Sequence, residues 1–253
     1  MCFADDDLTC DGFLSGRLRI LQPRQGYRAA MDPVLLAAAV PAAAGQSVLE
    51  LGCGVGVASL CLAARVPGLQ VAGVELQPAY AGLARRNAAA NGVAMVVWQA
   101  DLADLPDALR QQSFDHVIAN PPYFPPGGGT AARDAGRELA LREALPLADW
   151  VAVGLRRLRA GGCLTVVQMA ERLPDLMLAL ADQGGVAVLP IAPRAGRPAN
   201  RVILRVRKGG RAGFRLLAPL ILHDGAAHGR DGDSQSALAR AILRDGAALG
   251  WHD

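Results

Sequence analysis

Lysines and aromatic residues are scarce in this sequence. Lys208 is the only lysine in a chain with 26 lysines and arginines together, and aromatic residues make up 4% of the 253 residues. A hydrophobic core must therefore consist mostly of leucine, valine and alanine. Hydrophobic residues make up 52% of the chain, which excludes a protein that is mainly disordered. The net charge of +3 is too small to indicate nucleic-acid binding by itself.

Disulfide frameworks, zinc sites and membrane spans also lack their usual signs. The five cysteines are odd in number, and none of them forms a Cys-x-x-Cys pair. The N-terminus carries three aspartates at 5–7 and has no apolar signal core. The apolar run 34–44 is broken by Pro41 and is too short to cross a bilayer. We therefore expect a protein of the reducing cytoplasm, with no bound metal and no membrane partner.

Apolar runs of strand length alternate with helical stretches along most of the chain. The expected strands are 47–51, 71–75, 95–99, 114–119, 164–169, 187–191 and 201–206. The expected helices are 32–40, a stretch that ends at 64, 78–91, 138–158 with a break at Pro146, 173–183 and 236–248. This alternation predicts an α/β fold with a seven-stranded, mostly parallel sheet and helices on both faces. The last two strands lack a crossover helix, so the final strand should be antiparallel.

This pattern divides the chain into three regions. Residues 1–44 form an N-terminal lead-in with a short strand or hairpin, followed by a cover helix that Asp32 caps and Pro33 begins. Residues 45–210 form the main domain. Residues 211–253 form a C-terminal extension with a glycine- and aspartate-rich loop and a final helix.

A glycine-rich turn follows the first strand of the main domain. Gly52, Gly54 and Gly56 let the backbone turn tightly and approach a ligand closely. The spacing is not that of dinucleotide-binding proteins, because the last glycine of their fingerprint would have to stand at Val57 or Ser59. We therefore expect a ligand at the carboxyl end of this strand, and a dehydrogenase fits poorly.

Acidic residues end the next two expected strands. Glu75, followed by Leu76, stands where an acid can accept hydrogen bonds from ribose hydroxyls. Asp101, followed by Leu102, ends the third strand, where a carboxylate can accept a hydrogen bond from an adenine amine. Because the carboxyl ends of parallel strands meet at one edge of a sheet, the glycine turn and both acids should face one crevice.

Together these features resemble the class I S-adenosylmethionine-dependent methyltransferases, over about residues 45–210. The resemblance implies a Rossmann-like fold in which the glycine turn holds the methionine part of the cofactor, Glu75 the ribose and Asp101 the adenine. A cationic sulfonium suits an acid-lined crevice. The candidate cofactor-binding residues are Glu50, Gly52, Gly54, Gly56, Glu75, Leu76, Asp101, Leu102 and Asn120.

The fourth expected strand ends in Asn120-Pro121-Pro122-Tyr123. Amine nitrogens of adenine and of carboxamides are poor nucleophiles, because their lone pair is delocalised. Two acceptors against the N–H groups favour a more pyramidal nitrogen, and the Asn120 side-chain oxygen and the Pro121 carbonyl can supply them. Tyr123 offers a face on which a planar group can stack. The motif resembles that of amino-nitrogen methyltransferases, so we expect these four residues to be catalytic.

The lead-in resembles the N-terminus of the bacterial tRNA-valine adenine-N6 methyltransferases, which modify the adenosine just 3′ of the anticodon. The residues that carry this resemblance are Gly16–Arg28 and Met31–Leu36, although the family commonly has Ser where this chain has Pro33. In that family the stretch matching Gln22–Arg28 borders the cofactor pocket and the active-site mouth, which adds Arg28 to the candidate cofactor-binding residues. The resemblance implies that tRNA is the partner.

Arginines provide candidate contacts to RNA. The basic group from Arg194 to Arg215 suits contacts with phosphates, and 127–137 would form a flexible lip over the active site. The candidate substrate-binding residues are Tyr123, Phe124, Arg133, Arg137 and Arg197.

Other functions share parts of this pattern. A protein glutamine N5-methyltransferase acting on release factors has the same motif and cofactor core, but it usually carries a helical N-terminal domain, for which about 45 residues before Glu50 are too few. Another RNA or DNA adenine-N6 methyltransferase is a further alternative. A non-catalytic binding module of the same fold is the third, and the intact glycine turn and Asn120 argue against it. The oligomeric state, monomer or homodimer, stays open.

Overall fold

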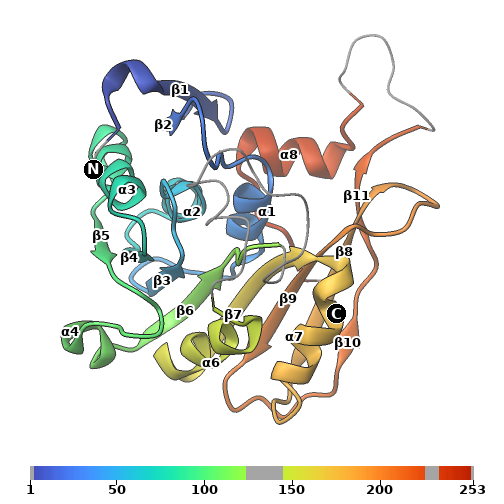
Figure 1. Cartoon of the computed structure of the whole chain (residues 1–253). Helices are drawn as coiled ribbons and strands as arrows, with labels where there is room; N and C mark the ends of the chain where they lie inside the picture. The colour runs from blue at the N-terminus through green and yellow to red at the C-terminus, as the bar shows by residue number, and fades with distance from the viewer. Residues whose placement is uncertain (1–2, 124–144, 226–233, 252–253) are drawn as a thin grey trace.

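A nine-stranded sheet organises the residues that the computed structural model describes, which are 3–123, 145–225 and 234–251 (Figure 1). Its strands are β3 (Ser47–Leu51), β4 (Gln70–Glu75), β5 (Met95–Gln99), β6 (Phe114–Ala119), β7 (Leu158–Met169), β8 (Val186–Arg194), β9 (Arg201–Arg207), β10 (Arg215–Leu216) and β11 (Leu220–His223). Across the sheet the order is β5, β4, β3, β6, β7, β9 and β8, and both β10 and β11 pair with β8.

The direction of the strands confirms the predicted mostly parallel sheet. The five strands from β3 to β7 are parallel to one another, whereas β9 is antiparallel to both β7 and β8. All seven expected strands are present, and the last of them is the antiparallel one. β10 and β11 were not predicted, and both lie parallel to β8 at the edge of the sheet.

Helices cover both faces of the sheet, as predicted. One face carries α1 (Asp32–Ala39), α2 (Val57–Arg65), α3 (Pro78–Ala90) and α8 (Ala237–Asp245). The other face carries α4 (Asp107–Arg110), α6 (Leu147–Arg157) and α7 (Leu173–Ala179). The described residues also contain two single-turn 3-10 helices, Asp5–Asp7 and Ala170–Arg172. Among those residues, no helix has both the length and the apolar character needed to cross a membrane.

An N-terminal hairpin docks on α3. Its strands β1 (Leu8–Phe13) and β2 (Leu18–Pro23) are antiparallel, so the hairpin expected in this region is confirmed. The buried Asn87 of α3 accepts from the backbone N–H of Leu21 at 2.8 Å and donates to its carbonyl at 3.0 Å. The same amide group also donates to the carbonyl of Val55 at 3.0 Å. Asn87 thereby joins the hairpin to the turn after β3.

The start of α1 differs from the sequence-based expectation, whereas the break before α6 agrees with it. The N-cap residue of α1 is Met31, and Asp32 is the first helical residue; its buried carboxylate binds side chains from distant segments instead of capping the helix. The break expected at Pro146 is confirmed, because α6 begins at Leu147 directly after it. The first part of the expected helix, 138–144, lies outside the described residues.

The C-terminal segment packs on α1. The backbone N–H of Leu249 donates to the Ala38 carbonyl at 2.8 Å, and Nε1 of Trp251 donates to the Ala39 carbonyl at 2.7 Å. The final helix was expected over 236–248, and α8 occupies the middle of this range. The boundary proposed after residue 210 falls between β9 and β10, which belong to the same sheet.

Candidate active site

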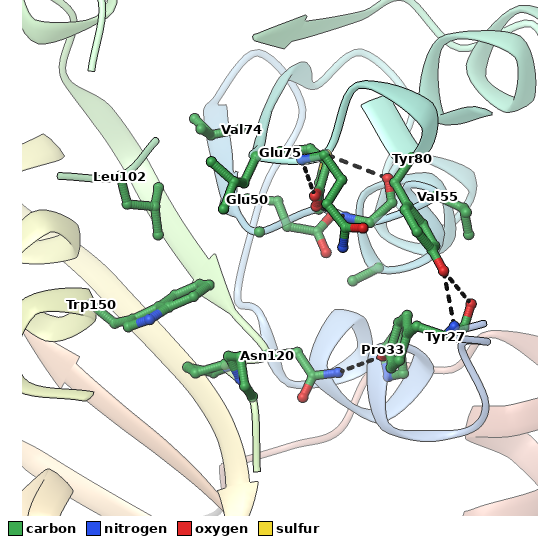
Figure 2. A pocket seen from close by; sticks show the side chains of 18 of the residues that line it. Tyr27, Pro33, Glu50, Val55, Val74, Glu75, Tyr80, Leu102, Asn120 and Trp150 are labelled. Atoms are coloured by element: carbon green, nitrogen blue, oxygen red, sulfur yellow. Dashed lines mark hydrogen bonds between the residues drawn. The ribbon is translucent and has the colours of Figure 1, made fainter. Parts of the chain in front are cut away.

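A cavity of about 260 Å³ lies where β3, β4, β5 and β6 end (Figure 2). The chain passes from β3 outwards to β4 and β5 and then returns to β6 on the other side of β3. The connection after β3 therefore leads towards β4, and the connection after β6 leads towards β7, in the opposite direction across the sheet. In open α/β sheets such a switch point is where ligands bind, beyond the carboxyl ends of the strands.

The glycine turn after β3 forms one wall of this cavity. Gly52 has a φ of 63°, and a Cβ atom there would lie only 2.6 Å from the Trp150 ring. Glycine is therefore required both by the left-handed backbone and by the close approach of Trp150. Cys53, inside the turn, is buried, and burial raises the pKa of its thiol, so it serves as a small apolar filler.

Glu75 connects the glycine turn with the end of β4. One of its carboxylate oxygens accepts from the backbone N–H of Gly54 at 2.9 Å, and the other accepts from the backbone N–H of Gln77 at 2.8 Å. Glu75 is only 7% exposed. Burial raises the pKa of this carboxyl group, and the two backbone hydrogen bonds oppose the shift.

Glu50 is a second buried acid beside the cavity. It accepts from the backbone N–H of Ser59 at 3.0 Å and from the hydroxyl of Ser59 at 2.6 Å. Burial raises the pKa of Glu50 to about 7, and these hydrogen bonds limit the shift. Neither Glu50 nor Glu75 forms an ion pair with the residues that the structure describes. Two buried carboxylates without a cation suit a positively charged ligand.

Asp101 and Leu102 line the cavity beyond the end of β5. Asp101 is exposed, and its Oδ1 accepts from the backbone N–H of Ala103 at 2.8 Å, which holds the loop in place. Leu102 is buried and contributes an apolar wall, as Figure 2 shows. The acid at this strand end therefore retains an oxygen for a ligand.

Asn120 projects from the end of β6 into the same cavity, opposite Tyr27 (Figure 2). Its amide nitrogen donates to the Tyr27 hydroxyl at 3.5 Å. Its Oδ1 is buried and has no hydrogen-bond partner among the described residues. Tyr27 is itself held by a 2.9 Å hydrogen bond from its backbone N–H to the Tyr80 hydroxyl. A buried carbonyl oxygen without a donor is costly unless a ligand supplies one.

Gln168 holds the two prolines that follow Asn120. This fully buried side chain on β7 donates through Nε2 to the carbonyls of Pro121 and Pro122, at 3.3 and 3.1 Å. Its Oε1 accepts from the backbone N–H of Met169 at 2.7 Å. The direction of both proline carbonyls therefore depends on a side chain outside the motif.

Most of the expected site residues meet at this cavity. Those that line it are Glu50, Gly52, Gly54, Glu75, Leu76, Asp101, Leu102, Asn120, Pro121, Pro122 and Tyr123. Gly56 does not line it, but ends the turn with a φ of 90° directly before α2. Arg28 does not line it either, because its guanidinium pairs with Asp11 at 2.5 Å and donates to the Pro23 carbonyl at 2.8 Å.

The remaining substrate-binding candidates lie away from the cavity or outside the described residues. Arg197 is exposed on the turn between β8 and β9 and does not line the cavity. The candidates that fall outside the described residues are Phe124, Arg133 and Arg137, with the rest of the expected lip at 127–137.

The basic group between Arg194 and Arg215 is not one surface. Arg194 is buried and donates to backbone carbonyls after β11, at the cavity edge of the sheet. Lys208 donates to the Leu158 carbonyl at 2.8 Å, at the opposite edge, where β7 begins. The seven residues of β9 separate these edges by about 20 Å. The members of this group therefore do not form one continuous surface at the cavity, and contacts between them and phosphates stay a prediction.

Sequence reasoning missed two residues that line the cavity, Tyr27 and Trp150, and one that supports it, Gln168. Tyr27 lines the cavity and lies within the segment 22–28 that the resemblance places at the active-site mouth, so the sequence already indicated where it lies. Trp150 lies in α6, and nothing in its sequence context indicates that its ring covers Gly52. Gln168 was a polar residue in an apolar strand, which indicated a buried partner but not its identity. Within the described residues, no group of three or more His, Cys, Asp or Glu side chains could hold a metal ion.

Comparison with known proteins agrees with this geometry. Residues 31–180 match the family described as Methyltransferase small domain. The chain is 31% identical over 250 residues to a tRNA1(Val) (adenine(37)-N6)-methyltransferase from Dickeya chrysanthemi, covering 94% of each chain. It is 33% identical to the protein of the same name from Actinobacillus succinogenes, covering 78% of this chain and 84% of that one.

Solved structures show the same fold. A predicted O-methyltransferase from Agrobacterium tumefaciens superposes with a TM-score of 0.70 at 27% identity, covering 87% of this chain and 98% of that chain. The 16S rRNA N2 G1207 methyltransferase of T. thermophilus, solved with AdoMet and guanosine, has a TM-score of 0.54 at 23% identity, covering 79% and 50%. The chain therefore belongs to the Methyltransferase small domain family and is an S-adenosylmethionine-dependent methyltransferase.

Proposed function

We propose that this enzyme methylates the exocyclic N6 amine of an adenosine in tRNA, close to the anticodon. Curated relatives named tRNA1(Val) (adenine(37)-N6)-methyltransferases match this chain over most of its length, which supports a tRNA substrate. The observation that carries the proposal is the buried Oδ1 of Asn120, an acceptor without a donor at the edge of the cavity. We also propose a cytoplasmic location, because its tRNA substrate is found there.

The chemistry assigned to the motif is activation of a weak nitrogen nucleophile. Asn120 Oδ1 accepts one N–H of the target amine, and the Pro121 carbonyl accepts the other. A carbonyl oxygen has two lone pairs, so Pro121 can accept this bond while it accepts from Gln168. With both N–H groups held, the nitrogen lone pair is less delocalised into the ring and points away from the acceptors. No strong base is needed, since positioning supplies most of the effect.

The cavity residues on the other side of Asn120 are assigned to the cofactor. We assign the turn at Gly52 and Gly54 to its methionine part, Glu75 to the ribose and Asp101 to the adenine. When bound, the cofactor supplies an activated methyl group on a sulfonium. Glu50 and Glu75 oppose that positive charge from a largely buried position, where charge interactions are stronger than in water.

The target base must leave its stack to reach the motif. A base in a tRNA loop is already partly exposed, which lowers the cost of turning it into a pocket. We assign its stacking face to Tyr123, and further contacts with RNA to Phe124, Arg133, Arg137 and Arg197. Charge contacts of this kind make RNA binding depend on salt concentration.

Methyl transfer with labelled cofactor tests the proposal. Unmodified total tRNA and release factor are offered in parallel, and the labelled nucleoside is then identified. We expect N6-methyladenosine in tRNA; label that appears only in release factor contradicts the proposal.

The role of Asn120 has its own test. Asn120→Ala should lower the transfer rate by at least ~100-fold, with cofactor affinity almost unchanged. Asn200→Ala, at an exposed position on the β8–β9 turn, is the matched control and should keep full activity. Equal losses of cofactor affinity and transfer rate would show that Asn120 does not act on the amine.

A further inference from the structure

Two side chains outside the Asn-Pro-Pro-Tyr motif hold Tyr123. The Tyr123 hydroxyl donates to Oδ2 of Asp32, and Cζ of Arg201 lies 5.1 Å from the centroid of the Tyr123 ring. Nε of Arg201 donates to the same oxygen of Asp32 at 3.1 Å. The three residues come from α1, from the segment after β6 and from the first position of β9, so only the folded chain brings them together.

We propose that Asp32 and Arg201 are positioning residues, which fix the Tyr123 ring as a rigid wall for the target base. This inference rests on the proposed function, since it requires a planar base beside the motif. Tyr123 lines the cavity together with Asn120, whereas Asp32 and Arg201 do not line it. Their direct side-chain contacts with the cavity lining are those to Tyr123, through its hydroxyl and its ring.

The burial of this ion pair supports a role beyond stability. The side chains of Asp32 and Arg201 are only 12% and 19% exposed. Taking two charges out of water costs about as much as their attraction returns, so such a pair is weak evidence for stabilisation. What the pair does achieve is orientation. Arg201 is also tied to the Asn200 carbonyl at 3.2 Å, which keeps its guanidinium over the ring.

The arrangement leaves the tyrosine with one usable face. The guanidinium of Arg201 covers one face of the ring through a cation–π contact. The hydroxyl is tied to Asp32, and the Tyr123 carbonyl accepts from Nη1 of Arg172 at 3.4 Å. A tyrosine that is held at its hydroxyl and at its backbone carbonyl loses little freedom when a base stacks on its ring. This raises the affinity for the base and fixes the angle at which it binds.

Steady-state methylation of tRNA by the full-length enzyme tests this role. Arg201→Leu should raise KM for tRNA about tenfold, the order of a lost base–aromatic stack, and should lower kcat less. Its affinity for S-adenosylmethionine should stay within about twofold. Arg201→Lys keeps the charge without the planar guanidinium and should be intermediate. If Arg201→Leu does not fold, the lysine variant carries the same comparison.

Arg205→Leu is the matched control. Arg205 lies on the same strand, and its Cζ lies 4.2 Å from the Trp251 ring, so the substitution removes the same kind of contact away from the cavity. Its KM for tRNA should equal that of the wild type. Equal increases of KM in Arg201→Leu and Arg205→Leu would overturn the inference, because a general structural loss would then explain both.

A double-mutant cycle gives a second readout. Asp32→Asn and Tyr123→Phe act on the same hydrogen bond. The double variant should therefore be no less active than the less active of the two single variants. Additive losses would overturn the inference. A wild-type enzyme that does not methylate tRNA overturns the proposed function and this inference together. A wild type that methylates tRNA, with KM unchanged in Arg201→Leu, overturns the inference alone.

Discussion

Replacing Gln168 with methionine tests whether the hydrogen bonds of this side chain hold the Asn-Pro-Pro-Tyr motif in place, because the sequence of the motif itself stays unchanged. The substitution keeps the size and shape of the side chain but removes three hydrogen bonds, two to the carbonyls of Pro121 and Pro122 and one from the N–H of Met169. Each is worth about 1 kcal/mol, so the free energy of unfolding should fall by about 3 kcal/mol. Equilibrium unfolding in urea measures this difference, provided that the slope of the transition is unchanged.

Activity should fall by more than stability alone explains. At temperatures where the Gln168→Met enzyme is fully folded, the Pro121 carbonyl has no donor to fix its direction. We expect kcat for tRNA to fall about tenfold, which corresponds to about 1.4 kcal/mol of lost positioning. The cofactor site does not contact Gln168, so affinity for S-adenosylmethionine should remain within about twofold of the wild type.

Thr165→Val is the control for this substitution. Thr165 lies on the same strand, is fully buried, and its hydroxyl has no partner among the described residues. Removing that hydroxyl should cost less than about 0.5 kcal/mol or stabilise the protein slightly. If Gln168→Met is no more destabilised than Thr165→Val, the hydrogen bonds of Gln168 do not hold the motif and the reasoning is refuted.

Three further substitutions address residues around the cavity: two on the cofactor side, at Gly52 and Glu50, and one beside Asn120, at Tyr27. Gly52→Ala places a methyl group against Trp150 at a φ of 63°, so thermal unfolding should show a loss of stability of at least about 1 kcal/mol. Titration should also show weaker cofactor binding, and adding Trp150→Ala should partly restore it. Because burial raises the pKa of Glu50 to about 7, the folded state keeps a proton that the unfolded chain loses above its ordinary pKa of 4.5. Stability should therefore fall by up to about 3 kcal/mol as pH rises through this window, and urea unfolding at pH 5 and pH 8 should show no such fall in Glu50→Gln. Tyr27→Phe removes the acceptor for the Asn120 amide, so kcat should fall about fivefold at unchanged cofactor affinity; equal losses of both would contradict this role.

The position of the cavity could be predicted from the sequence because each signal stands at a strand end. The glycine turn, Glu75, Asp101 and Asn120 follow four consecutive apolar strands, and parallel strands place such residues at one edge. The signals are local, and the rule that joins them is general to parallel sheets. No contact between distant residues was needed to infer that they share one crevice, and the residues that line the cavity are Gly52, Gly54, Glu75, Asp101 and Asn120.

The side chains that support the site could not be predicted in this way. Gln168 lies 46 and 47 residues from the prolines that it binds, and Asp32 lies 91 residues from Tyr123. A local rule even gave the wrong role to Asp32, since an aspartate before a proline suits an N-cap. The distant partners Tyr123 and Arg201 outweigh that preference. β10 and β11 were missed for a related reason: segments of two and four residues have no periodicity, and only pairing with β8 makes them strands.

The arginines show why a surface cannot be derived from counting charges along the chain. Arg201 and Arg207 stand at the two ends of one strand, so residues that are close in sequence lie at opposite edges of the sheet. The cavity-edge members Arg194 and Arg201 are committed to contacts within the protein. Side chains that are held within the protein are less available to phosphates, so we predict that stacking at Tyr123 contributes more to the proposed tRNA binding than Arg194 and Arg201 do. Under the proposed function, the moderate net charge of +3 agrees with a substrate that is held mainly by the shape and stacking of one exposed base.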